Sequence, residues 1–169
     1  MQDFTEEKLV VDFIHMKIKN KNISYSFLAL SILLFGCNDS QQVTENIPRG
    51  LINAYIDLNL ASYQHLNNVG THAYIEGGVK GVLIIHDYDD QWYAFERTCA
   101  HNPTKKCSHI WVDSINIQLM CGQFSNSTTF IECCESKYTY SGFPIKGPSQ
   151  GRLAQYYISK TGNILQVYN

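Results

Sequence analysis

The sequence predicts an all-β domain, a small sandwich or barrel of short antiparallel strands. From Leu51 onward, short runs rich in β-branched and aromatic residues alternate with turn residues. No segment keeps a helical period of apolar residues for more than a few turns. The 11 Tyr and 8 Phe spread over many of these runs, which is typical of core and cross-strand packing. With 169 residues, 44% of them apolar, the chain can form one such domain and a short extension.

Turn residues mark where the strands end. Gly77-Gly78 and Asp89-Asp90 separate early strands, and Thr161-Gly162-Asn163 predicts a hairpin between the last two. One brief helix is expected at 62–67. In chain order, strands are predicted at 51–58, 73–75, 81–86, 92–96, 110–113, 117–121, 130–133, 154–159 and 164–168.

The amino-terminal part has the pattern of an export signal. Three lysines between Met16 and Lys21 precede a mainly apolar run, 25–35, which is too short to span a bilayer comfortably. The run ends in Gly36-Cys37 and resembles the bacterial lipobox, which implies lipidation of Cys37. A buried helix or a plain membrane anchor is the alternative. Because residues 1–15 carry four acidic groups, unlike a signal peptide, translation is expected to start at Met16.

Composition divides the chain into three parts. An upstream extension and signal peptide covers 1–36, a polar flexible tether covers 37–50, and the β domain covers 51–169. Lipidation would anchor the domain in the bacterial cell envelope, outside the cytoplasm, where the five cysteines after Cys37 can pair. The net charge of −2, without a basic cluster in the domain, argues against nucleic-acid binding.

Two short segments carry soft metal ligands. Cys99-Ala100-His101 follows an apolar strand directly, and Cys133-Cys134 is followed by Ser136-Lys137-Tyr138 and then by Gly147-Pro148. Deprotonated thiols and imidazoles bind iron and zinc well, and a Cys-x-His turn can direct both groups to one side. From 52 to 169 the order of these features resembles a Rieske-type iron-sulfur domain, in which a Gly-Pro turn covers the cluster.

The resemblance implies a ligand set with one gap. Rieske loops each supply one cysteine and one histidine, and the match assigns Cys99, His101 and Cys134 as metal ligands. Cys134 stands where the family has its second histidine, and Ile131 stands where it has its second cysteine. The fourth ligand is left open as Cys121, Cys133 or none.

Some Rieske-like sequences also carry one extra cysteine in each loop, joined as a disulfide. Cys107 and Cys133 occupy comparable places, so the resemblance implies a disulfide between them.

The expected function is therefore that of a membrane-anchored Rieske-like protein that binds a [2Fe-2S] cluster and transfers electrons to or from a separate redox partner. The alternative is a non-catalytic Rieske-fold lipoprotein that has lost the cluster and is stabilised by disulfides or binds zinc. A stand-alone enzyme is not expected, because about 120 domain residues leave no room for an oxygenase catalytic domain. A nucleophile elbow, a phosphate loop and a catalytic carboxylate pair are also missing from the sequence.

Overall fold

The computed structural model describes residues 47–169. Most of the amino-terminal predictions lie outside the described residues. They are the extension and signal peptide at 1–36, the start at Met16, the lipidation site Cys37 and most of the tether. Within 47–169, no helix is both long enough and apolar enough to cross a membrane.

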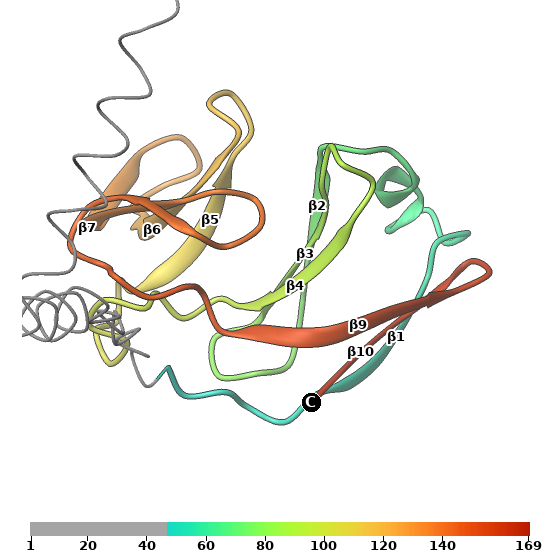
Figure 1. Cartoon of the computed structure of the whole chain (residues 1–169). Coiled ribbons are helices and arrows are strands. Elements are labelled where there is room, and N and C mark those ends of the chain that lie inside the picture. Colours follow the sequence, from blue (N-terminus) through green and yellow to red (C-terminus); the bar gives the residue numbers. More distant parts are fainter. Residues whose placement is uncertain (1–46) are drawn as a thin grey trace, which may run out of the picture. The chain divides into compact units, whose positions relative to one another are not determined.

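The all-β prediction is confirmed: the described domain consists of two antiparallel sheets (Figure 1). One sheet has six strands in the order β1-β10-β9-β4-β3-β2, and the other has four in the order β5-β6-β7-β8. In chain order the elements are β1 (Asn53–Asp57), the 3₁₀ helix η1 (Gln64–Asn67), β2 (Thr71–Ile75), β3 (Val82–His86), β4 (Trp92–Glu96), β5 (His109–Asp113), β6 (Gln118–Phe124), β7 (Phe130–Tyr138), β8 (Pro144–Lys146), β9 (Gln155–Thr161) and β10 (Ile164–Tyr168).

Strand prediction succeeded best where apolar runs are bounded by turn residues. The predicted limits of β4 and β10 match the structure at both ends, and β9 and β10 form the expected hairpin. The short helix is present as η1. Three differences concern the four-stranded sheet: β6 continues to Phe124, β7 continues to Tyr138, and β8 was not predicted. β8 has only three residues and begins with Pro144, so it lacks a strand-like pattern.

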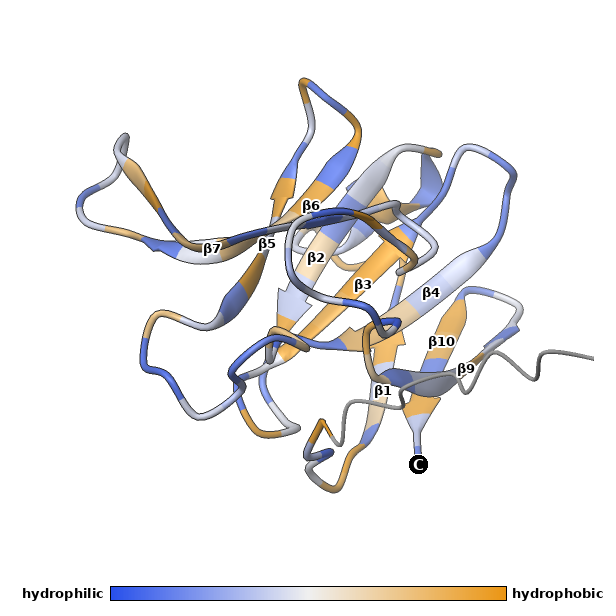
Figure 2. Cartoon of the chain, turned by 60° about the vertical axis from the view of Figure 1, so that its left-hand side comes forward, coloured by the Kyte–Doolittle hydropathy of each residue, from blue (hydrophilic) through white to orange (hydrophobic). Residues whose placement is uncertain are grey.

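Strand β3, next to the edge strand β2, is buried along its whole length and contributes to two cores. Figure 2 shows it coloured as hydrophobic along most of its length. Successive strand residues point to opposite faces. Leu83 and Ile85 accordingly pack in one core, and Val82 and Ile84 pack in the other. The first core is shared with β5, β6 and β7 of the four-stranded sheet and contains Cys99. The second core is lined by β1, β10 and η1.

Packing of the domain begins before Leu51. Ile47 is buried in the first core, although the sequence assigned it to the tether. The Gly50 carbonyl oxygen accepts a hydrogen bond from Asn169 Nδ2 at 3.1 Å and lies 3.2 Å from the hydroxyl oxygen of Tyr156. Residues 47–50 therefore pack on the β domain.

Candidate metal site

The loop between β4 and β5 holds the first cysteines of the site. Its ends are joined by a hydrogen bond of 3.3 Å from the Cys99 amide to the Ser108 carbonyl. Lys80 Nζ also donates to three carbonyls of this loop, those of Pro103 at 2.9 Å, Lys105 at 2.7 Å and Ser108 at 3.0 Å. These bonds keep the backbone around Cys99 in a fixed conformation.

A bulge in β7 presents the second pair of cysteines. β6 and β7 pair regularly on both sides of it, through Met120 with Lys137 and Gly122 with Glu132. Between these pairs, residues 133–136 of β7 face the single residue Cys121 of β6. Strict alternation would turn one of two adjacent side chains away from the core, but a bulge redirects side chains. Cys133 and Cys134 consequently both pack against the first core.

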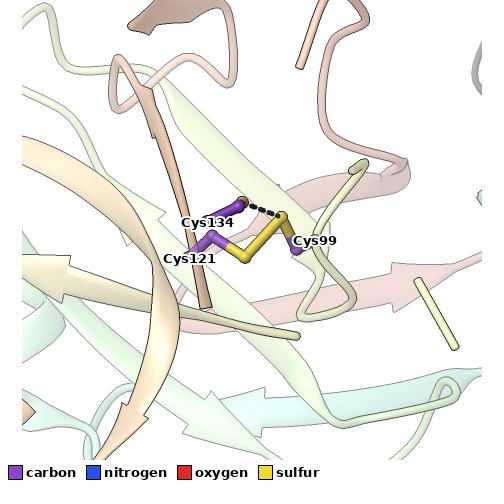
Figure 3. A group of neighbouring side chains, drawn as sticks. All are labelled: Cys99, Cys121 and Cys134. Carbon is purple, nitrogen blue, oxygen red and sulfur yellow. Dashed lines mark hydrogen bonds between the residues drawn. A yellow bond between two sulfur atoms is a disulfide. The ribbon is translucent and has the colours of Figure 1, made fainter. Parts of the chain in front are cut away.

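Three sulfur atoms meet between the two sheets (Figure 3). The Sγ atoms of Cys99, Cys121 and Cys134 all lie within 4.8 Å of one another. Cys99 and Cys121 are joined as a disulfide with their Cα atoms 5.8 Å apart. Cys134 is the free cysteine of the described residues, and its Sγ lies 3.6 Å from that of Cys99. The Tyr138 hydroxyl lies 3.8 Å from Cys99 Sγ and closes one side of the group.

Access to the group differs among its members. Cys99 is fully buried and Cys121 is 1% exposed, whereas Cys134 is half-buried. Solvent or a partner can therefore reach the group through Cys134.

A second disulfide lies beside this group. Cys107 and Cys133 are joined, with Cα atoms 5.4 Å apart. This is the pair that the resemblance implied, and it ties the β4–β5 loop to β7.

The turn at Gly147-Pro148 lies directly against the bulge. Gly147 has a φ of +89°, and a Cβ atom at this position would collide with the backbone of Glu135. The Ser149 amide donates a hydrogen bond of 3.1 Å to the buried Ser136 hydroxyl. A glycine is needed here both for the left-handed conformation and for the close approach. The turn thus packs against the bulge that carries Cys134.

The structure brings together two of the three predicted ligands. Cys99 and Cys134 meet, but His101 lies outside the three-sulfur group, and Cys121 takes part instead. The sequence left Cys121 as one option, and a local signal favoured it: Leu119 and Cys121 both face inward on β6, two residues apart. Ile131 is 48% exposed and pairs with Gln123 beyond the bulge, so it is not part of the group.

These residues do not fit a Rieske cluster with two histidine ligands. The second loop offers a thiol in place of an imidazole, and His101 is outside the group. They do fit a single metal ion bound by thiolates. Metal–sulfur bonds of about 2.3 Å in a tetrahedral site place neighbouring sulfurs about 3.8 Å apart, close to the 3.6 Å between Cys99 and Cys134. Such an ion would need Cys99 and Cys121 in their reduced form and would leave one position for a further ligand.

The chain has structural but no sequence matches among known proteins. No family model matches the chain, and no curated protein matches it significantly in sequence. One similar solved structure is the cyanobacterial plasma membrane Rieske protein PetC3 from Synechocystis PCC 6803. It is 19% identical, with a TM-score of 0.43, and the match covers 58% of this chain and 86% of that one.

A second similar structure is the ferredoxin of carbazole 1,9a-dioxygenase from Nocardioides aromaticivorans IC177. It is 14% identical, with a TM-score of 0.42, and the match covers 68% of this chain and 97% of that one.

Proposed function

We propose that this chain is a Rieske-like redox protein of the bacterial cell envelope, lipid-anchored at Cys37, which binds iron through Cys99, Cys121 and Cys134 and transfers electrons to a separate partner. The convergence of three sulfur donors from three different segments carries the proposal. Thiolate donors suit iron, and thiolate-bound iron changes its oxidation state one electron at a time.

The surroundings of the three sulfurs support this role. Buried Cys99 and Cys121 would hold the ion away from water, whereas half-buried Cys134 would place one ligand near the surface. A metal ion in this position would be shielded from water and would still lie close enough to the surface for electron exchange with a docked protein. The hydrogen bonds from Lys80 to the β4–β5 loop and the Cys107–Cys133 disulfide keep the sulfur donors in place.

The link between Cys99 and Cys121 favours a second candidate function. A domain that keeps this disulfide has no complete thiolate site, and the protein would then be a disulfide-stabilised, non-catalytic lipoprotein. The three thiolates could also bind zinc in such a non-catalytic protein, because zinc has no redox chemistry in proteins.

Metal analysis of the full chain, purified with and without reductant, tests the proposal. After reduction and anaerobic addition of iron, we expect one iron per chain, with visible sulfur-to-iron absorption once the bound iron is oxidised to the ferric state. Cys134→Ser and Cys99→Ser should each reduce iron binding at least tenfold. Ile131→Val, on the same strand as Cys134, should leave it unchanged and serves as the matched control.

The result also separates the alternatives. Zinc at one per chain with colourless protein would support the zinc variant. Colourless protein without any metal after reduction would overturn metal binding and leave the disulfide-stabilised module. If His101→Ala reduced iron binding as strongly as Cys134→Ser, and two irons were found per chain, a two-iron cluster would replace the single ion.

A further inference from the structure

We propose that Cys134 exchanges with the Cys99–Cys121 disulfide, so that the chain alternates between two disulfide pairings of the same three cysteines. A free thiol and a disulfide face each other here within the interior of one domain. Cys134 Sγ lies 3.6 Å from Cys99 Sγ, whereas an S–S bond is about 2.05 Å long. The approach that exchange requires is therefore about 1.5 Å.

The exchange needs no outside oxidant or reductant. Cys134 gives its proton to water, and the resulting thiolate attacks Cys99 Sγ. The new bond joins Cys134 to Cys99, and the electron pair of the old bond leaves with Cys121 Sγ, which takes up a proton from water. One thiol and one disulfide are present before and after the step, so atoms and electrons balance.

Cys99 is the sulfur that faces Cys134, at 3.6 Å. Cys133, the neighbour of Cys134, is held in its disulfide with Cys107, which fixes the bulge and leaves Cys134 beside the three-sulfur group. Because Cys134 is half-buried, its thiol can exchange protons with solvent. Exchange then moves the free thiol from the accessible β7 to Cys121, which is 1% exposed on β6.

The two pairings connect the domain differently. In the pairing seen here, the β4–β5 loop is joined to β6 through Cys121 and to β7 through Cys133. After exchange, both disulfides would join this loop to β7, and β6 would keep a buried thiol. The proposal involves only protein sulfur, so it stands or falls without any metal, and it is tested with a chelator present.

Peptide mapping of the full chain without reduction tests the exchange. The oxidised protein is incubated with chelator, quenched in acid and labelled with a thiol-reactive maleimide. Trypsin is unsuitable because no Lys or Arg lies between positions 107 and 136. Chymotrypsin cleaves after Trp111, Phe124 and Phe130, which separates Cys107, Cys121 and the Cys133-Cys134 pair.

We expect the label on the Cys134 peptide to fall during incubation and the label on the Cys121 peptide to rise by the same amount. Cys121→Ser should form the Cys99–Cys134 disulfide under the same oxidant. Cys134→Ser is the matched control, because it should keep Cys99–Cys121 alone. Circular dichroism of each variant shows that it is folded.

Two outcomes would overturn the proposal. In the first, the maleimide label of the wild type stays on Cys134 throughout the incubation, and Cys99 and Cys134 remain free thiols in the folded Cys121→Ser variant. In the second, Cys134 exchanges with the Cys107–Cys133 disulfide instead. Fragmentation of the Cys133-Cys134 peptide would then show a new Cys107–Cys134 pair.

Discussion

The hydroxyl of Tyr156 donates a hydrogen bond of 2.8 Å to Glu96 Oε2 in the interior of the domain. Glu96 is fully buried at the end of β4. Its carboxylate also accepts bonds from the amides of Val79 at 2.7 Å, Lys80 at 2.9 Å and Thr98 at 3.2 Å. One carboxylate therefore joins β9, the turn before β3 and the start of the cysteine loop. Buried polar groups of this kind are stable only when their hydrogen bonds are made.

Tyr156→Phe should destabilise the domain by about 1–3 kcal/mol, because it removes one donor from a buried carboxylate. Urea unfolding measures the change. Tyr157→Phe is the matched control, since Tyr157 is 68% exposed and the neighbour in sequence. Equal losses in the two variants would mean that the Tyr156–Glu96 bond contributes nothing specific.

Alkaline pH should weaken the wild type more than Tyr156→Phe. Burial raises the pKa of Tyr156 well above its usual value, and the hydrogen bond to Glu96 and the charge of Glu96 raise it further. The stabilisation from protonated Tyr156 is fully present below the unfolded pKa of about 10 and is lost as pH rises from there through the higher folded value. Urea midpoints of the two proteins should converge above about pH 10. A constant difference across that range would contradict this assignment.

Lys80→Met should loosen the cysteine loop. The substitution removes a donor that contacts three carbonyls, and we expect a loss of about 1–3 kcal/mol. Amide exchange should become faster at Ser108 and at Cys99, whose hydrogen bonds close the loop. Lys106→Met, at an exposed position of the same loop, should leave both rates unchanged. Unchanged exchange at Ser108 in Lys80→Met would show that the loop is held by other contacts.

Loss of the Cys107–Cys133 disulfide should destabilise the oxidised protein by about 3 kcal/mol on the chain-entropy model. The sequence separation of 26 residues sets this size. The comparison is between wild type and Cys107→Ala/Cys133→Ala by denaturant unfolding without reductant. Treatment of both proteins with reductant should remove most of the difference, and a difference that persisted would point to lost packing instead.

Cys37→Ser should release the protein from membranes, because it removes the proposed acceptor of the lipid. Membrane fractionation and the mass of the mature protein measure the effect. Cys134→Ser, which alters a cysteine within the β domain, should stay in the membrane fraction. If Cys37→Ser remained there with an unchanged mass, the anchor would lie elsewhere.

Local sequence was sufficient to predict most of the strands. Trp92–Glu96 and Ile164–Tyr168 are compact runs between turn signals, and their limits were correct. β7 was predicted too short because Glu132, Glu135 and Lys137 interrupt its apolar character. These side chains are tolerated because Glu132 and Glu135 are exposed and Lys137 is only partly buried.

The site was predictable only in part. Cys99 and Cys134 could be found because each sits in a recognisable segment. Cys121 joins them and His101 does not, because β6 lies beside the β4–β5 loop. This arrangement is set by packing between two sheets and not by the spacing of ligands along the chain.

The bulge at 133–136 has a consequence for how such a domain can diversify. The ladder on one side of it, around Lys137, and the ladder on the other, around Glu132, pair with β6 independently. A residue gained or lost between them would therefore leave both ladders in register while changing which side chain meets the buried sulfurs. A change in length at this point would therefore act on the sulfur contacts and on the contacts of the bulge with Gly147 and Ser149, rather than on the pairing of β6 with β7.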